Sequence, residues 1–447
     1  MCSSDLGAVT LPMRHLTPLI ALAAMLGFST GAALALDIDV EGNIELELRH
    51  HPYEGRHEDM EQDFASIAGE FELGLFSPSG RHAVILKPFG RYDQHDHERS
   101  HVDLREGKYR YVNGLFEASI GVDKEFWGVT EFLHLVDIIN QTDNVESTDG
   151  EQKLGQPMVK VSYASRFGTL TGYALPYFRI RQYPDPVTGR PNPAFVVADN
   201  TTLFESGETG GKARRVDDVA LRYHNSFGAF DVGLSWFDGT AREPQLLFTG
   251  DQNSTNDLPK LQAYYADVTQ AGLDVQATLG PWLLKLEATQ STQTLKLPDP
   301  DPAARMLPSL ISAEKETEIN RATGGFEYTF YNLFNSGTDL GLVAEYMYDE
   351  RKDAAPHPFG NDIGIGLRWT ANDPQSTAIL LGGLIDLDTD SSSISVEAER
   401  RIGRSFKAVL EARFIDKVGK NDDGEQDRFA AVLADEDSVR FRLAYYF

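Results

Sequence analysis

A period of two dominates the chain from Leu36 to Phe447, where apolar residues alternate with polar or small ones over stretches of about ten residues. Examples are NIELELR (43–49), AFDVGLSWF (229–237) and FKAVLEARF (406–414). Because successive side chains of a strand point to opposite faces, each stretch predicts a strand with one apolar face. No run of about 18 apolar residues follows Leu36, so the pattern predicts an all-β chain without a membrane-spanning helix.

The connections between these predicted strands alternate between short and long. The short ones carry Gly, Pro or Asn at turn positions, as in Asn113-Gly114 and Gly280-Pro281. The long ones are polar and mostly acidic, and they cover 128–156, 180–213, 240–265, 296–318 and 419–435. Turns on one rim and loops on the other are typical of an up-and-down antiparallel barrel. We expect about 18 strands, with 16 left open by weak strand edges between 81 and 112.

The strands of a soluble sandwich or propeller also alternate apolar and polar residues. The second face of the predicted strands distinguishes these folds from a membrane barrel. That face carries charged residues, and aromatic residues gather near the strand ends, at Trp236-Phe237, Trp282, Tyr346 and Tyr348, Trp369, and 445–447. Aromatic girdles of this kind face lipid at the membrane interfaces. No repeat of about 40–45 residues indicates a propeller. The sequence therefore predicts a transmembrane β-barrel of the outer membrane.

The N-terminal part is expected to be a cleavable export signal. Arg14 gives a positive start, 19–28 form an apolar core, and Ala33-Leu34-Ala35 is an A-x-A cleavage site. Residues 1–12 add nothing to such a signal, and we expect the natural start at Met13. The predicted division is therefore a signal peptide over 1–35 and a barrel over 36–447.

Charge and cysteine content exclude several classes of function. The formal charge of −27, without any basic run, argues against nucleic-acid binding. The single cysteine, Cys2, lies before the expected mature chain, which excludes disulfides, thiolate metal sites and thiol nucleophiles. No cofactor is expected.

One long stretch, 123–157, departs from the period of two. Phe132, Leu135, Val136 and Ile139 recur at helical spacing, which predicts a short amphipathic helix. We favour a placement inside the barrel, where the segment narrows a channel, over a cap outside or a contact with a neighbouring subunit. The polar residues expected at the constriction are Glu131, His134, Asp137 and Asn140.

This stretch also carries a family resemblance. Trp127-Gly128, followed by Asp137, Asn140 and Asp143 in the pattern D-x-x-N-x-x-D, resembles a largely uncharacterised group of porin-like outer-membrane proteins of Gram-negative proteobacteria. Further similar pieces, such as 154–158, 168–170 and 272–274, extend the resemblance over most of the mature chain. It implies a barrel, but the substrates of the group are largely unknown.

The face assigned to the lumen carries charges of both signs. Among them, Arg222, Arg368, Arg413, Arg440 and Arg442 are expected to line the pore. Rings or opposed rows of charge select ions and orient polar solutes, whereas simple pairing across the wall is the plainer interpretation. The basic residues of this face are Arg49, Lys108, Arg110, Arg222, Lys285, Arg368, Lys407, Arg413, Arg440 and Arg442, and the acidic ones are Glu45, Glu47, Glu70, Glu72, Glu117, Asp231, Glu287, Glu327, Glu397 and Glu411.

The last ten residues, SVRFRLAYYF, predict the strand that closes the barrel. Their apolar face ends on Tyr445 and Phe447, and we expect it to pair with the first strand near Ile44 to Leu48 so that no edge is open in lipid. Tyr445 and Phe447 are also the expected signal for the barrel-assembly machinery.

The sequence favours neither a metal site nor a catalytic site. His95, His97 and His101 form the densest group of potential metal ligands, but a solvated loop tip is the plainer interpretation, and no metal is expected. No histidine spacing singles out a nucleophile, and the only G-x-S-x-G, at 27–31, lies in the signal peptide, so an enzyme is not expected.

The expected function is passive diffusion of small hydrophilic solutes through the lumen. The alternative is a barrel without an open channel, serving in adhesion, assembly or export, and an outer-membrane hydrolase is less favoured. Expected partners are outer-membrane lipid, lipopolysaccharide, the assembly machinery and the solutes. By analogy alone, a homotrimer is one option, because trimers are common among porins of 16 to 18 strands.

Overall fold

A computed structural model describes residues 36–55, 60–147, 150–191, 196–197, 202–203, 209–210, 213–248, 260–296, 314–351 and 359–447. The expected signal peptide, 1–35, lies outside the described residues. Among those described, no helix has the length and apolar character needed to cross a bilayer. The short helical elements are η5 (Leu333–Asn335) and α2 (Arg428–Leu433).

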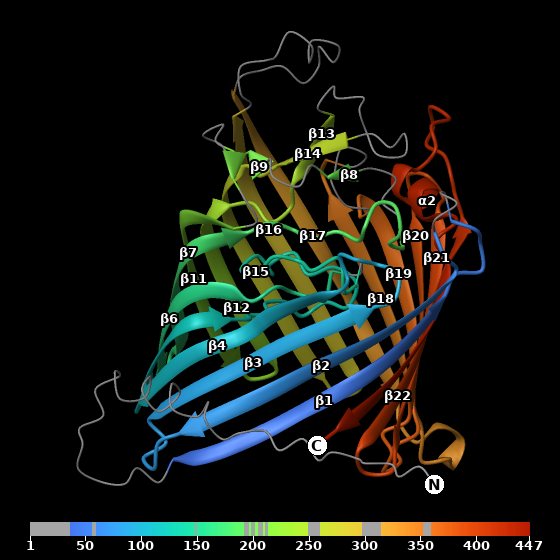
Figure 1. The fold of residues 1–447 in the computed structure, drawn as a ribbon. Helices are drawn as coiled ribbons and strands as arrows, with labels where there is room; N and C mark the ends of the chain where they lie inside the picture. The colour runs from blue at the N-terminus through green and yellow to red at the C-terminus, as the bar shows by residue number, and fades with distance from the viewer. Residues whose placement is uncertain are drawn as a thin grey trace, which may run out of the picture. The chain divides into compact units, whose positions relative to one another are not determined.

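The described residues form a closed barrel of 18 antiparallel strands, as predicted (Figure 1). Each strand pairs with the next along the barrel, and the last pairs with the first. The barrel strands are β1 (Asp37–His50), β2 (Asp63–Phe76), β3 (His82–Asp93), β4 (His101–Asn113), β5 (Phe116–Asp123), β6 (Gln156–Ser165), β7 (Gly168–Arg179), β11 (Ala213–Phe227), β12 (Phe230–Thr240), β15 (Asp267–Leu279), β16 (Trp282–Lys296), β17 (Glu314–Phe330), β18 (Asp339–Asp349), β19 (Asn361–Thr370), β20 (Ala378–Asp386), β21 (Ser392–Ile402), β22 (Phe406–Lys417) and β23 (Ser438–Tyr446).

The two rims differ as the sequence predicts, with tight turns at one end and long connections at the other (Figure 1). Gly114 and Gly280 hold φ of +61° and +64° in two of the turns, a conformation that glycine adopts at least cost. At the loop end, a small second sheet is formed by β8 (Val196–Val197), β9 (Thr202–Leu203), β10 (Thr209–Gly210), β13 (Gln245–Phe248) and β14 (Lys260–Tyr264).

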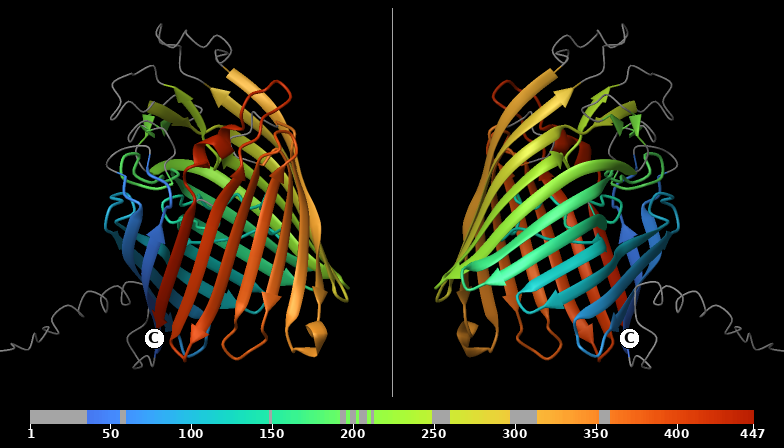
Figure 2. Two further views of the ribbon diagram at one scale, coloured as in Figure 1. Left: turned by 90° about the vertical axis from the view of Figure 1, so that its right-hand side faces the viewer. Right: turned by 90° about the vertical axis from the view of Figure 1, so that its left-hand side faces the viewer.

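The closing contact is the one predicted. Ile44, Leu46 and Leu48 of β1 pair in register with Tyr445, Leu443 and Phe441 of β23. Figure 2 shows the first strand, in blue, beside the red C-terminal strand. Closure leaves every barrel strand with a partner on both sides, which satisfies the backbone hydrogen bonds that a bilayer cannot.

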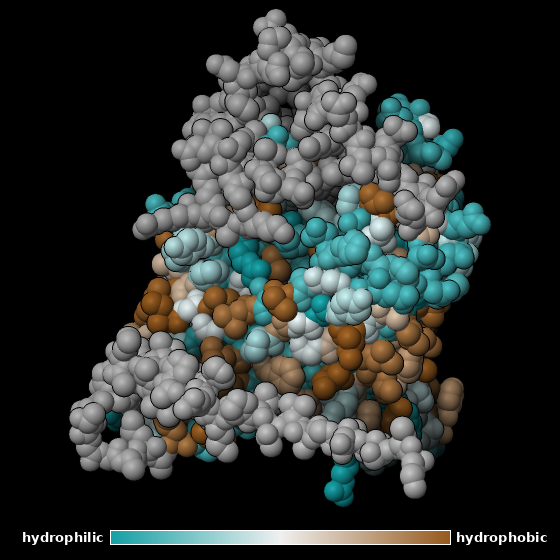
Figure 3. Space-filling model, viewed as in Figure 1, coloured by the Kyte–Doolittle hydropathy of each residue, from teal (hydrophilic) through white to brown (hydrophobic). Residues whose placement is uncertain are grey.

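Polarity is inverted relative to a soluble protein. Five outward residues of β1, Ile38, Val40, Ile44, Leu46 and Leu48, are apolar and 43–61% exposed, whereas inward Glu47 is only 1% exposed. On the face shown in Figure 3, hydrophobic residues form a band over the lower part of the strands, and hydrophilic residues gather toward the loop end. The strand register places all the charged residues predicted for the lumen at inward positions. This is the surface of a transmembrane barrel.

Two aromatic residues expected in the girdles face the inside of the barrel. Trp236 points outward and is 43% exposed, but its neighbour Phe237 is 1% exposed in an apolar cluster inside the barrel. Tyr446 likewise occupies an inward position, paired with Asn43. Adjacent residues of a strand face opposite sides, so two neighbours cannot both face lipid.

Candidate functional site

The segment between β5 and β6 lies inside the barrel, as predicted, but it is not helical. Its described residues, 124–147 and 150–155, contain turns and bends without a helix. Five of their backbone N–H groups, those of Val129–Phe132 and Val136, are bound by side chains of the barrel wall instead of by the carbonyls of a preceding helical turn. We name residues 124–147 and 150–155 the inner segment.

Glu287 of β16 is the first wall residue that holds the inner segment. Its carboxylate, 0% exposed, accepts hydrogen bonds from the backbone N–H groups of Val129 at 2.7 Å, Thr130 at 3.1 Å and Val136 at 3.2 Å. The Thr130 hydroxyl donates to the same carboxylate at 2.7 Å. A buried carboxylate is stable only when it is so bonded, and its charge strengthens each bond.

Glu345 of β18 is the second anchor. It accepts from the backbone N–H groups of Glu131 at 2.9 Å and Phe132 at 3.0 Å. The Glu131 carboxylate also binds the wall. It pairs with Lys285 of β16, and with Arg368 of β19 at 2.8 Å. This part of the inner segment is thereby tied to three wall strands.

The far end of the inner segment is tied to β3 and to the connection after it. Arg91 donates from Nε to the Glu146 carboxylate at 3.1 Å, and Arg99 donates from Nε to the Val145 carbonyl at 3.2 Å. Arg99 also pairs with Glu47 of β1 at 2.7 Å, with side chains 1% and 2% exposed. Since β3 and β16–β18 belong to different parts of the wall, the inner segment runs across the lumen.

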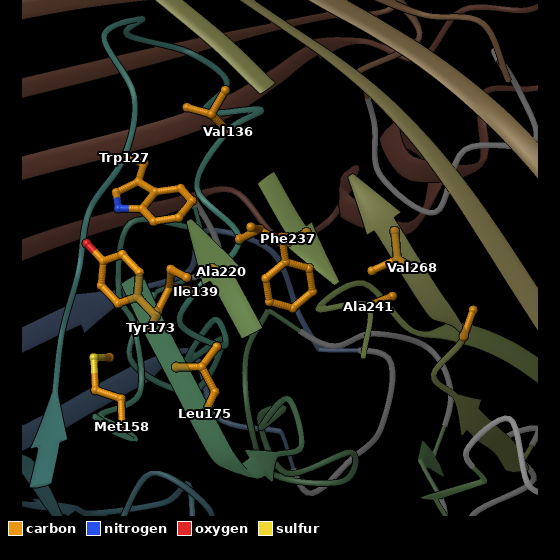
Figure 4. Close-up of a cluster of buried hydrophobic side chains, with 12 residues drawn as sticks. Trp127, Val136, Ile139, Met158, Tyr173, Leu175, Ala220, Phe237, Ala241 and Val268 are labelled. Atoms are coloured by element: carbon orange, nitrogen blue, oxygen red, sulfur yellow. The ribbon is translucent and has the colours of Figure 1, made fainter. Parts of the chain in front are cut away.

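An apolar cluster fills the space on one side of the inner segment (Figure 4). Trp127, Val136 and Ile139 of the segment pack against Tyr173 of β7, Phe237 of β12 and their neighbours. The full cluster is Trp127, Val136, Ile138, Ile139, Met158, Tyr173, Leu175, Ala220, Phe237, Ala241, Ala266 and Val268. The inner segment is therefore packed against β7, β11 and β12 through apolar side chains.

A polar cavity of about 590 Å³ lies on the other side of the inner segment; we name it the main cavity. Its wall comes largely from β1–β4 and β18–β23. The described charged residues that line it are eight carboxylates, Glu45, Glu47, Glu70, Glu131, Glu146, Glu151, Glu397 and Glu411, and six guanidinium groups, Arg91, Arg105, Arg368, Arg413, Arg440 and Arg442. Most are paired: Arg440 and Arg442 both bind Glu411, and Arg368 bridges Glu131 and Glu327.

The structure brings six of the predicted pore residues to the main cavity and places three elsewhere. Glu131, His134, Arg368, Arg413, Arg440 and Arg442 line it. Arg222 instead lies 4.9 Å from the Trp127 ring and pairs with Asp274 at 3.0 Å.

Asp137 and Asn140 are buried within the inner segment. Asp137 pairs with Lys153 at 3.1 Å, while Asn140 donates to the carbonyls of Asp123 and Leu154. We therefore leave them out of the constriction proposed below.

The residues that anchor the inner segment are not apparent from the sequence. The sequence predicts Glu287 only as a lumen charge, and it gives Glu345, Arg91, Arg99 and Glu146 no distinguishing pattern. A carboxylate in the apolar context of AEYMYD, around Glu345, is the one local signal that something polar must face it.

The three histidines of the candidate metal group have other surroundings. The His95 ring lies 5.7 Å from that of Phe64, and the His101 ring lies 5.7 Å from that of Phe89. His97 is exposed in the β3–β4 connection. Within the described part of the chain, no group of three or more His, Cys, Asp or Glu side chains is placed to hold a metal ion.

The Glu131 anchor gives a pH prediction. Burial alone would raise the pKa of Glu131. The hydrogen bonds and the positive charges of Lys285 and Arg368 outweigh burial and lower this pKa below its usual 4.5. Because the pKa is lowered, the stabilisation that ionised Glu131 gives to the folded state is fully present above pH 4.5. This stabilisation is lost as the pH falls through the lowered pKa. We expect Glu131→Gln to change single-channel conductance at pH 7, and this difference from the native protein to shrink only after the pH has fallen below 4.5, through the lowered pKa. A difference that is already lost above pH 4.5 would contradict the assignment.

No protein-family model and no curated protein matches the sequence. Among solved structures, the chain is similar to an outer-membrane protein OmpT of Vibrio cholerae in its trimer form, at 11% identity and a TM-score of 0.43, over 92% of this chain and 100% of that one. It is also similar to OccD3 (OpdP) of Pseudomonas aeruginosa, at 10% identity and a TM-score of 0.48, over 93% of each chain. The chain is similar to a variant of the Rh. blastica porin as well, at 11% identity and a TM-score of 0.40, over 92% of this chain and 100% of that one. These likenesses are distant and assign no function to this chain.

Proposed function

We propose that this protein is an outer-membrane channel through which small hydrophilic solutes diffuse passively along the main cavity. The observation that carries the proposal is this cavity, polar and charged, inside a closed barrel whose outer face is apolar. Its lining reaches from Phe359, Leu384 and Ser393 near the loop end to Asn43 and Tyr446 near the turn end. A polar passage along the lumen of a barrel that is apolar on its outside suits the movement of polar solutes across a membrane.

The inner segment supplies the constriction in this proposal. Glu131 and His134 of the segment line the main cavity together with Arg440 and Arg442 of β23. A narrow passage lined by charges of both signs favours polar solutes over apolar ones.

The remaining parts of the proposal concern the setting of the channel. The chain is exported by the signal peptide over 1–35, the barrel over 36–447 is inserted by the assembly machinery with Tyr445 and Phe447 as its signal, and the loops meet lipopolysaccharide. A homotrimer is the assembly proposed, by analogy with porins of similar size.

The direct test is conductance across a planar bilayer with two variants of β21. Ser395 faces inward and lines the main cavity, whereas Ala398 of the same strand lies outside its lining and pairs with Ile379 on the outer face. We expect ionic steps from the native protein, clearly smaller steps from Ser395→Trp, because an indole would occupy part of the route, and unchanged steps from the matched control Ala398→Trp.

Absence of ionic steps from native protein under all salt and voltage conditions would remove the channel and favour the barrel without an open lumen. Equal steps from Ser395→Trp and native protein would show that solutes do not pass the main cavity. Swelling of liposomes in a neutral sugar then measures whether uncharged hydrophilic solutes follow the same route as ions.

A further inference from the structure

A second cavity, of about 240 Å³, opens off the main cavity near the loop end; we name it the side pocket. The two share Glu146, Ser147, Ser395, Arg413 and Arg440 among their lining residues. Residues of two connections, Arg190 and Pro191 and then Leu433 and Glu436, complete its lining. The volume lies below the roughly 300–1,000 Å³ of pockets for drug-sized ligands, so it suits a small solute.

Arg49, near the end of β1, is the unusual residue of this pocket. Its Nη1 donates to the Arg190 carbonyl at 2.8 Å, and its guanidinium group lies 4.8 Å from the centre of the Phe64 ring. Its Nε and Nη2 are buried and have no hydrogen-bond partner among the described residues. Buried donors of a charged group are almost always bonded, so two of them on one side chain need an explanation.

The two unpartnered nitrogens lie on the same edge of the planar guanidinium group. Their N–H bonds run parallel, which is the arrangement that receives the two oxygens of a carboxylate or phosphate. The third nitrogen, already bonded to Arg190, fixes the plane of the group. Arg49 thus presents a preset fork to the side pocket.

The carboxylates around the side pocket are engaged with other groups. Glu436 pairs with Arg190 at 2.8 Å, Glu411 binds Arg440 and Arg442, and Glu146 pairs with Arg91 at 3.0 Å. Asp437 accepts from the Ile415 backbone N–H at 2.8 Å. None of these four is hydrogen-bonded to the Arg49 fork. Glu47, Asp93 and Asp96 lie close enough to act on Arg49 by charge, but no hydrogen bond from its Nε or Nη2 reaches them.

His51 is a second buried polar group in the lining. Its side chain is 1% exposed, and its Nδ1 lies 3.9 Å from the Glu436 carboxylate, beyond hydrogen-bond distance. Burial, with the charges of Arg49 and Arg190, lowers the pKa of His51 to about 2, so the ring is neutral at pH 7. A neutral ring adds a hydrogen-bonding group without adding charge.

We propose that the side pocket binds the oxyanion of a small solute, a carboxylate or a phosphate, in two parallel hydrogen bonds from Arg49. Ser393 and Ser395, which also line the pocket, offer hydroxyl groups to the rest of the solute. The inference deepens the proposed function, since it names a class of solute that pauses on the route, and it rests on that function only for access from the main cavity.

A purely structural role for Arg49 makes different predictions. In that case its contacts with the Arg190 carbonyl and the Phe64 ring are all that matter, and substitution changes stability without changing any affinity. Arg49→Lys keeps the positive charge and removes the fork, so it separates geometry from charge. Arg49→Gln removes both. Arg400→Gln is the matched control, because Arg400 is 52% exposed and pairs with Asp373 near the turn end, outside both cavities.

The test is calorimetric titration of the purified full-length protein in detergent with succinate, with inorganic phosphate and, as a neutral probe, with glycerol. We expect native protein and Arg400→Gln to bind succinate or phosphate saturably with equal affinity. Arg49→Gln should weaken the affinity at least about tenfold, equivalent to 1.4 kcal/mol, and Arg49→Lys by a smaller factor. Binding of succinate alone identifies a carboxylate site, and binding of phosphate alone identifies a phosphate site.

Three results would overturn the inference: no saturable binding of either anion to the native protein, unchanged affinity in both Arg49 variants, or an equal loss in Arg400→Gln. Should Arg49→Gln fail to fold, Arg49→Lys still decides between fork and charge. Ionic steps in a bilayer without anion binding would remove this site and leave the channel. Anion binding without ionic steps would remove the channel and leave the site.

Discussion

Replacing Glu287 and Glu345 together with glutamine is expected to release the inner segment and enlarge the single-channel conductance, with noisier steps. The two carboxylates accept hydrogen bonds from five backbone N–H groups, those of Val129, Thr130, Glu131, Phe132 and Val136. A bond to a charged acceptor contributes about 1.5–3 kcal/mol, against about 1 kcal/mol for a neutral one. Glutamine keeps the shape and loses the charge, so the anchoring weakens by several kcal/mol while the strands themselves keep their pairing.

Two measurements check this expectation. Planar-bilayer recording reports the size of the ionic steps, and limited trypsin digestion of the folded barrel reports whether Lys124 and Lys153 in the inner segment become accessible. The matched control is Glu117→Gln, an inward, half-buried glutamate of β5 that pairs with Arg110 at 3.6 Å near the turn end and contacts no residue of the inner segment. Steps and digestion equal to those of the native protein in the double variant would show that the apolar cluster alone holds the segment.

Most of the barrel could be predicted from the sequence because barrel strands obey local rules. Alternation in NIELELR places Glu45 and Glu47 inward and Ile44 and Leu46 outward, whatever lies beside the strand. Turn residues such as Asn113-Gly114 mark the short rim for the same reason. The pairing of β23 with β1 follows because a barrel in lipid cannot leave an edge unpaired.

The placement of the inner segment inside the barrel could be predicted from the sequence, but its backbone conformation could not. Val136 and Ile139 share a helical spacing, yet both are 0% exposed in the same cluster without any helix between them. The partners that decide the backbone, Glu287 and Glu345, lie 151–214 residues away in the sequence. Local periodicity cannot detect such partners, so it assigned the N–H groups to a helix.

The two N–H groups of Arg49 that are free within the described part of the chain could not be predicted from the sequence either, because they depend on contacts that are distant along the chain. From the sequence, Arg49 is one inward charge among many, and pairing across the wall is its plain interpretation. Whether it has a partner depends on where Arg190, Glu436 and Glu411 lie after folding, and those residues come from other elements. The absence of a pair could be recognised only once all of them were placed.

Deleting Phe447 is expected to lower the yield of folded barrel far more than removing an exposed aromatic residue elsewhere. Phe447 donates its backbone N–H to the Gly42 carbonyl at 3.1 Å and accepts from the Gly42 N–H at 3.2 Å, so it forms the end of the closing seam. Its ring lies 5.8 Å from that of Phe71 on β2. Deletion leaves both Gly42 groups unpaired beside lipid, where each unsatisfied group costs several kcal/mol.

The yield is measured as the fraction of purified chain that refolds into lipid vesicles, read from the heat-modifiable mobility of folded barrels on gels. Phe447→Ala keeps the seam and removes the ring, so an intermediate loss separates backbone pairing from aromatic packing. Phe334→Ala is the matched control, because Phe334 is 93% exposed in the β17–β18 turn and closes nothing. Equal yields from the deletion and from Phe334→Ala would show that the barrel closes without its last residue. A deletion that refolds normally in vesicles but fails to reach the outer membrane in cells would assign Phe447 to recognition by the assembly machinery instead of to closure.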